Sequence, residues 1–319
     1  MDDHFVSQTY LRSFTNSEGY LIPYYKADHA IIGKPKLPKT VCYEVDGDSN
    51  KYFSDPRVLD SYLPQFENPW QQNVQALRRQ SLDDIVKYQI AGYVAFSRTC
   101  TPTAKRMGKE MLEAVVQPTF DSIAERFFKE HPPESSKAMD LIGRALKQKE
   151  IRVDVDRQFP HALGISSLVQ SIERYFHGNW LVMINEGSRP FITSDNPAVA
   201  YYHTRDHSIA QIYVPLAPDI AILIAAALED RPIQFPIRRG TLTSINRFAS
   251  PKLEYVDTFN ELIIKAAELR VFSDRVGSWI EESVRKHKDW RMETVVDELP
   301  NDRGSIIVTR QLVRRRERA

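Results

Sequence analysis

The chain has 319 residues, of which 42% are hydrophobic and 27% charged, a composition typical of a globular protein that buries a sizeable core. Its 43 basic and 42 acidic residues leave a formal charge of +1, which excludes a whole-molecule field that draws the protein to nucleic acid or anionic lipid. The two cysteines, Cys42 and Cys100, exclude a disulfide framework and lack metal-ligand spacing, so we expect two unreactive thiols.

Targeting and membrane signals are missing from the sequence. The acidic start Met1-Asp2-Asp3-His4 has neither the basic nor the apolar region of a signal peptide. The longest apolar run, residues 220–228, is shorter than the roughly 20 residues that span a bilayer. We therefore expect a soluble, cytoplasmic protein with no membrane partner; the oligomeric state is not readable from the sequence.

The first 55 residues predict short extended segments separated by turns. Residues 21–25 and 51–53 are expected as strands. Between His4 and Phe14, apolar residues at helical spacing predict one or two helical turns.

A helical pattern covers residues from about 56 to 177. Leu82, Ile85, Val86, Ile90 and Val94 form a core-facing stripe, and Ser81 is the expected N-cap of that helix. Further helices are expected at about 103–129, 136–151 and 164–176, the last of them ended by Gly178.

The pattern then changes to strands. Residues 180–184 and 191–193 are expected to pair as a hairpin, and 199–202, 211–214 and 220–224 as further strands. A helix at 257–286 and a strand at 305–308 precede a basic tail at 314–318. These elements predict an α+β protein, with a helical region (about 56–177) packed on a mostly antiparallel sheet (about 179–225 plus N-terminal and C-terminal strands). We expect one α+β domain over residues 1–290, with the helical region as an insertion, followed by the C-terminal strand and tail at 291–319.

Standard catalytic signatures are absent from the sequence. It has no GxGxxG, GxxxxGK[ST], HExxH, GxSxG or CxxC pattern, and its 12 glycines are not clustered. Rossmann and P-loop nucleotide binding are therefore disfavoured, and no cofactor is assigned. His203 and His207 stand four residues apart in an expected loop, where helical spacing has no meaning, so this pair predicts no metal site. His4 and Asp195 have the chemistry to bind a hard or borderline cation, but no spacing identifies the further carboxylates that such a site needs.

Two segments combine side chains that could take part in catalysis or substrate binding. His4, Gln8 and Arg12 share one side of a helix if the segment is helical, where they offer an acid or base, an amide and a clamp for carboxylate or phosphate. In Thr193-Ser194-Asp195-Asn196-Pro197 a strand end holds Asp195 where it can orient His4 or act as a base. Each segment also has a purely structural interpretation: local pairing of the three N-terminal side chains, and a turn favoured by Asp and Asn before Pro.

Both segments resemble signatures of a bacterial family of unknown function, domain-of-unknown-function family 4238. His4-Phe-Val-Ser-Gln8-x-Tyr-Leu-Arg12-x-Phe14 resembles its opening H-[FY]-V-P-Q-x-Y-L-[RK]-x-F pattern, with Ser7 in place of the usual Pro. Residues 191–197 resemble its F-[IV]-T-S-D-N-P pattern, and 214–218 its P-L-S-P strand, with Ala217 in place of Ser. Residues 260–272 resemble a C-terminal helix that begins with Asn260, and 98–102 an R-T-P pattern.

The resemblance carries no established activity, but it favours the polar residues of these segments as one shared site. We predict catalytic roles for His4 and Asp195 and substrate contacts for Gln8, Arg12, Ser194 and Asn260. On that hypothesis the protein is a hydrolase acting on a phosphate-bearing substrate, nucleic acid or a nucleotide, such as a nuclease-like effector of phage defence.

Two alternatives stay open. The first is a non-catalytic sensor that binds a ligand or partner between the helical region and the sheet. The second is a buried hydrogen-bond network, in which the same residues tie the N-terminus to the sheet and the last helix.

Overall fold

The computed structural model describes residues 2–27, 31–132, 135–148, 150–202, 210–225, 245–301 and 304–316. The expected loop with His203 and His207, part of the apolar run 220–228 and the last residues of the basic tail lie outside them. Within the described residues the predicted α+β class is confirmed. None of the helices described there is both long and apolar enough to cross a membrane.

A five-stranded sheet lies at the centre, with the strand order β6-β7-β8-β4-β9. The pairs of β6 (Val199–Tyr202), β7 (Ala210–Ala217), β8 (Ile220–Ala225) and β4 (Asn179–Ile184) are antiparallel, whereas β9 (Asn246–Ala249) pairs parallel to β4. The mostly antiparallel sheet expected over about 179–225 is therefore present. The N-terminal and C-terminal strands that were expected in it belong to other sheets, so this part of the prediction is wrong.

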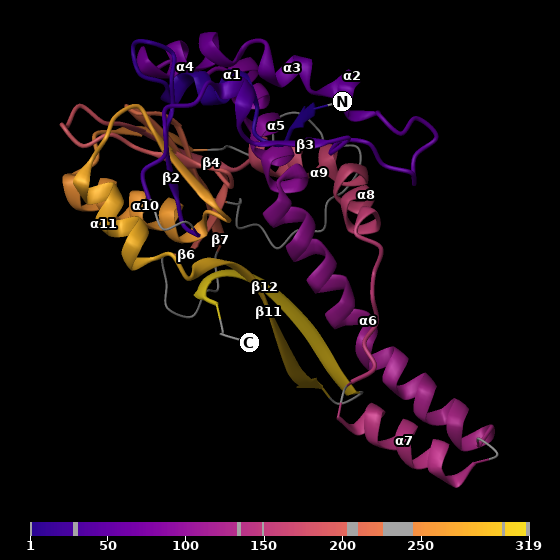
Figure 1. Ribbon diagram of the computed structural model, residues 1–319. Helices are drawn as coiled ribbons and strands as arrows, with labels where there is room; N and C mark the ends of the chain where they lie inside the picture. The colour runs from indigo at the N-terminus through magenta and orange to yellow at the C-terminus, as the bar shows by residue number, and fades with distance from the viewer. Residues whose placement is uncertain are drawn as a thin grey trace.

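Helices cover both faces of this sheet (Figure 1). Along β4, Trp180 and Val182 pack in the core with α5 (Asp84–Cys100) and α9 (Leu168–Phe176), whereas Met183 packs in a second core with α10 (Leu253–Ala266) and α11 (Ser278–Lys286). Because alternate side chains point to opposite faces, burial of both faces explains the continuous apolar runs of these strands.

Three smaller sheets surround this layer. β1 (Asp2–His4) pairs with β3 (Tyr43–Val45), and β10 (Arg270–Ser273) lies between β2 (Ile22–Tyr25) and β5 (Thr193–Ser194). A long hairpin joins β11 (Trp290–Asn301) to β12 (Gly304–Arg315). β12 contains the predicted strand 305–308 and extends into the arginines of the predicted tail.

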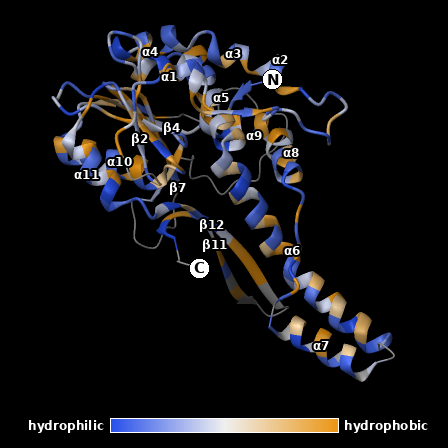
Figure 2. Cartoon of the chain, in the orientation of Figure 1, coloured by the Kyte–Doolittle hydropathy of each residue, from blue (hydrophilic) through white to orange (hydrophobic). Residues whose placement is uncertain are grey.

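The helical region begins with the short helices α2 (Leu59–Tyr62), α3 (Pro64–Glu67) and α4 (Trp70–Arg78) and ends with α8 (Gln158–Ser166) and α9. Between them α6 (Pro102–Glu130) and α7 (Ser136–Lys147) project side by side from the body (Figure 1). Hydrophilic and hydrophobic residues alternate along the projecting part (Figure 2). The β11–β12 hairpin lies against α6, and Thr294 Oγ1 of β11 donates to the Met107 carbonyl of α6 over 3.2 Å.

Several predicted boundaries are wrong for local reasons. Residues 51–53 form a turn, because Asn50 Oδ1 accepts the Tyr52 N–H at 3.0 Å. Asp83, and not Ser81, caps α5 by accepting the Val86 N–H at 2.8 Å. The single helix expected at 164–176 is two helices that meet at Ser167, whose hydroxyl bonds the carbonyls of the preceding turn.

Two larger predictions are also wrong. Residues 180–184 and 191–193 do not pair as a hairpin: β4 pairs with β8 and β9, while β5 pairs with β10. The helix expected at 257–286 is broken into α10, β10 and α11, because the chain becomes extended at Ala267. Because α10 already starts at Leu253, Asn260 lies within this helix and does not begin it.

Candidate functional site

The N-terminal motif is not one continuous helix. His4 lies in β1, opposite Tyr43 of β3, whereas Gln8 begins the short helix α1 (Gln8–Leu11) and Arg12 begins the 3-10 turn η1 (Arg12–Phe14). Gln8 Nε2 is nevertheless 3.5 Å from His4 Nδ1, so these two side chains meet as expected. Arg12 is exposed. Burial lowers the pKa of His4, against an opposing effect of the Lys39 backbone.

Asp195 is buried, and backbone groups surround its carboxylate. Oδ1 accepts the Glu268 N–H at 2.9 Å, and Oδ2 accepts the N–H groups of Leu269 and Arg270 at 2.8 and 2.9 Å. Burial raises the pKa of Asp195 to about 6, and these three N–H groups oppose the rise. The carboxylate therefore holds the segment that follows α10, and this segment leads into β10.

The neighbours of Asp195 fix the same region. Ser194 Oγ accepts the Asn196 N–H at 3.1 Å, and Asn196 Nδ2 donates to the Ala266 carbonyl at the end of α10 over 3.0 Å. Asn260 Oδ1 accepts the Ile192 N–H at 3.1 Å, while its Nδ2 donates to the Pro190 carbonyl over 2.9 Å. Through these amide contacts α10 is joined to the chain on both sides of β5: Asn260 contacts the residues before it, and Asn196 follows it.

The two motifs do meet, through residues outside the predicted site. The Tyr10 hydroxyl lies 2.6 Å from Thr193 Oγ1 and donates to the Pro215 carbonyl over 2.7 Å. The Tyr10 ring is buried and stacks on Tyr93 at 5.0 Å between ring centroids. Tyr10 was predicted only as an apolar helix position. Its hydroxyl is the signal for this contact, since the O–H of a buried tyrosine usually finds a hydrogen-bond partner.

The predicted site is thus divided between two places. In the part of the chain described, no hydrogen bond or ion pair joins His4, Gln8 or Arg12 to Asp195. The polar atoms of Ser194, Asp195 and Asn260 bond to backbone, which supports the buried-network interpretation for these three residues. Their catalytic and substrate roles stay predictions. The described residues also contain no cluster of histidine, cysteine and acidic side chains that suits a metal ion.

A cavity of about 470 Å³ lies between the helical region and the five-stranded sheet. Its wall combines side chains from α5, α6, α8, α9, β6 and β7 with the β11–β12 hairpin. The wall is partly apolar, with Met107 and Met111 of α6 and Tyr175 of α9. Its volume lies within the range of roughly 300–1,000 Å³ that is typical of small-molecule sites.

Three cationic side chains of the described residues line this cavity, and two of them have carboxylate partners. Lys105 Nζ is 2.9 Å from Glu44 Oε2, and Arg310 pairs with Asp297. Arg98 differs: its Nη1 donates to the Ala198 carbonyl at 3.2 Å and its Nη2 to Gln311 Oε1 at 2.6 Å, both neutral acceptors. No carboxylate of the described residues is within ion-pair distance of Arg98 or lines the cavity.

His161 is buried in the cavity wall and uncharged. Burial, together with the nearby Lys105, lowers its pKa to about 3. The Asn50 amide is oriented by Gln158 and Tyr52, so its Nδ2, 3.5 Å away, donates to His161 Nδ1. The proton of the neutral ring therefore lies on Nε2. His161 and Gln311 were not predicted as site residues, and Arg98 was noted only for the R-T-P pattern.

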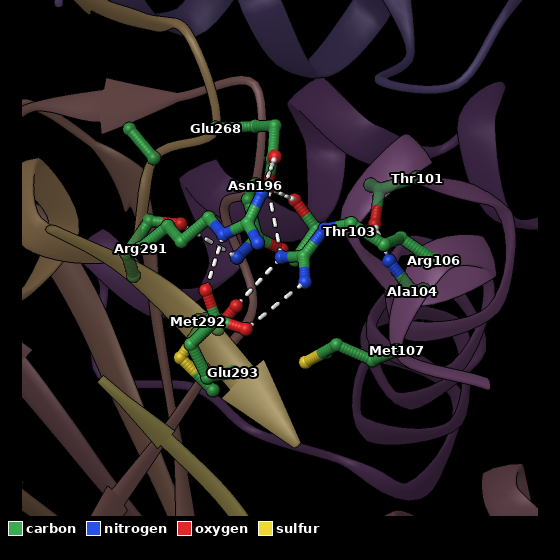
Figure 3. A network of polar contacts seen from close by, with 12 residues as sticks. Thr101, Thr103, Ala104, Arg106, Met107, Asn196, Glu268, Arg291, Met292 and Glu293 are labelled. Carbon is green, nitrogen blue, oxygen red and sulfur yellow. Dashed lines mark hydrogen bonds and ion pairs between the residues drawn. The ribbon is translucent and has the colours of Figure 1, made fainter. Parts of the chain in front are cut away.

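An ion-pair network beside the cavity connects α6 to β11 (Figure 3). Arg106 of α6 pairs with Glu268 at 3.0 Å and with Glu293 at 3.5 Å, and its Nη2 donates to the Met292 carbonyl over 2.6 Å. Glu268 is also the residue whose N–H bonds Asp195. The network therefore joins the segment held by Asp195 to the α6 and β11 walls of the cavity.

The fold and this site define a layered α+β protein with a partly open cavity between its helical and sheet layers. A family model described as "Protein of unknown function (DUF4238)" matches residues 3–276, and the chain belongs to that family. The match confirms the suspected resemblance, and it ends before β11. No curated protein and no solved structure matches the chain.

Proposed function

We propose that this chain is a non-catalytic binding protein, whose cavity between the helical region and the sheet takes a small organic ligand. The cavity itself is the supporting observation: about 470 Å³ of space with a partly apolar wall and a few polar groups. Its position is the one expected for a sensor pocket, between the helical region and the sheet.

The chemistry of the wall favours binding over catalysis. No carboxylate of the described residues lines the cavity, and the pKa of His161, lowered by burial to about 3, makes this histidine a poor proton shuttle near neutral pH. The competing hypothesis, a hydrolase acting on nucleic acid or a nucleotide, depends on His4 and Asp195. It gains no support from an Asp195 carboxylate that accepts three backbone N–H groups.

The test is ligand-observed NMR with a panel of one-ring and two-ring aromatic carboxylic acids and their primary amides. We expect compounds of this panel to bind the full chain and to compete with one another. Ser171→Trp, on the α9 wall, should abolish binding because the indole fills the cavity. Val169→Trp is the matched control, because Val169 is on the same helix but 57% exposed and outside the cavity wall.

Two results would overturn this proposal: no binding of the panel to the full chain, or equal binding by the Ser171→Trp and Val169→Trp variants. Thermal melts of both variants should stay close to that of the unmodified chain, because Ser171 is only partly buried and Val169 is exposed.

A further inference from the structure

The cavity wall carries one positive charge that no carboxylate of the described residues neutralises. Among its described lining residues are Arg98, Lys105 and Arg310 and no acid. Lys105 is balanced by Glu44, and Arg310 by Asp297, whose carboxylates lie outside the wall. Among the described residues, the acceptors of Arg98 are a carbonyl and an amide oxygen. The burial of His161 keeps that ring neutral, so it changes nothing in this balance.

We infer that the ligand is an organic anion whose acid group binds Arg98 and whose apolar body lies in the same cavity. This inference rests on the proposed binding function. A partly buried guanidinium with neutral partners retains much of the desolvation cost of its charge, and an anion inside the cavity offsets that cost. A cationic ligand would add to the charge and is disfavoured.

The geometry of Arg98 suits a planar acid group. Two of its five N–H groups bond Ala198 and Gln311, one on each terminal nitrogen, which leaves three donors without a partner among the described residues. Two neighbouring donors of a guanidinium bind both oxygens of a carboxylate in parallel. Because both terminal nitrogens are already held, the plane of the group is fixed before the ligand arrives.

The apolar part of the wall suits the body of such a ligand. Met107 is buried and Met111 is 37% exposed. Both line the cavity from α6, and Tyr175 lines it from α9. Methionine side chains adapt to irregular shapes and contact aromatic rings favourably. An aromatic or branched aliphatic acid therefore suits this cavity better than a small, strongly hydrated anion.

One residue that holds Arg98, Gln311, comes from the C-terminal β11–β12 hairpin. Gln311 lies in β12, beyond residues 3–276 that the family model matches, whereas Arg98 lies within them. The hairpin therefore orients an arginine that belongs to the family-matched part of the chain. The substitution Gln311→Glu therefore places a negative charge beside Arg98 without altering any residue that the family model matches.

The experiment measures dissociation constants of naphthalene-2-carboxylate and naphthalene-2-carboxamide for the full chain by isothermal titration calorimetry. The two probes share one shape and differ in charge. We expect the acid to bind at least about tenfold more tightly, in line with the strength of charge-assisted hydrogen bonds. Arg98→Gln should remove this preference, while Arg174→Gln, an exposed arginine of α9 outside the wall, should keep it.

Gln311→Glu guards against a folding defect of Arg98→Gln. This near-isosteric change places a carboxylate on Arg98, so the arginine stays in place but acquires an internal counter-ion. We expect it to lower the affinity for the acid at least tenfold and to leave the affinity for the amide unchanged.

Amide binding as tight as acid binding, or an acid preference that survives both Arg98→Gln and Gln311→Glu, would overturn the inference about charge and leave the ligand-binding proposal standing. Binding of neither probe, together with no binding of the wider panel, would overturn both. The two failures are therefore distinguishable.

Discussion

Asp195 offers the sharpest test of whether the family signature builds a site or a scaffold. In Asp195→Ala the backbone N–H groups of residues 268–270 lose their acceptors, which lie at 2.8 to 2.9 Å. At about 1–2 kcal/mol for each partly buried donor, the loss in the free energy of unfolding is roughly 3–6 kcal/mol. Burial raises the pKa of Asp195 to about 6, so removal of the charge relieves some desolvation, and we expect the lower half of that range.

Asp195→Asn separates the shape of the side chain from its charge. The amide oxygen can still accept two of the N–H groups, but its NH₂ then faces the third donor, so we expect a loss of about 1–3 kcal/mol. Urea unfolding followed by circular dichroism measures both variants. Glu186→Ala is the control, because this acid is exposed and makes no hydrogen bond to a described residue.

A loss of less than about 1 kcal/mol in Asp195→Ala would refute the structural role, since three stranded donors cost more than that. Normal stability of this variant together with lost nucleolytic or defence activity would instead support the catalytic role predicted for Asp195. A large loss in Asp195→Ala, an intermediate loss in Asp195→Asn and none in Glu186→Ala is the pattern that we expect.

Two further stability predictions use other buried groups. Tyr10→Phe should lower the free energy of unfolding, measured in urea, by about 1–3 kcal/mol, because the Thr193 hydroxyl and the Pro215 carbonyl lose a buried partner. Tyr43→Phe is the control: Tyr43 is 42% exposed, so this variant should stay within about 0.5 kcal/mol of the unmodified chain. In the folded chain the pKa of His161 is lowered by burial to about 3, below its ordinary value. As the pH is lowered, the unfolded chain therefore binds the proton first, and the free energy of unfolding decreases. Between about pH 7.5 and 5 the unmodified chain should lose about 2 kcal/mol more than His161→Gln, and equal losses would contradict the neutral, buried histidine.

Strands and helices with strong periodicity could be predicted from the sequence, because their cause is local. Val86, Ile90 and Val94 of the stripe predicted for α5 face the core, as do the apolar runs of β7 and β8. Ile85, also expected in that stripe, lies in the first turn of α5 and is 68% exposed, so this part of the prediction is wrong. The predictions are wrong where a polar group far away in the sequence determines the backbone conformation. The expected helix 257–286 breaks because Asn196 bonds the Ala266 carbonyl at its end and Asp195 binds the next N–H groups, two contacts that span more than 60 residues of chain. Periodicity carries no information about such partners.

For the candidate site, contacts between residues distant in the sequence were even harder to predict. The motifs correctly indicated that the N-terminal segment and the Thr193–Pro197 turn meet, but the contact is made by Tyr10 and Thr193 and not by His4 and Asp195. Arg98 and His161 belong to helical patterns in which neither residue stands out. What makes them candidates is what surrounds them: a carbonyl and an amide for Arg98, and an oriented asparagine for His161.

The polar network and the cavity come from different parts of the sequence, and this difference bears on the family. The contacts of Asp195, Asn260 and Tyr10 lie wholly within the matched residues 3–276, and every one of them ends on backbone or on a neighbouring side chain of the fold. A signature of this kind specifies how the layers meet, because a buried polar group tolerates few alternative partners. The cavity instead combines Arg98 with Gln311, from the hairpin beyond the match. Relatives that share the signature should therefore share the layered fold, whereas the partner of Arg98 in this chain comes from a segment that the family match does not cover.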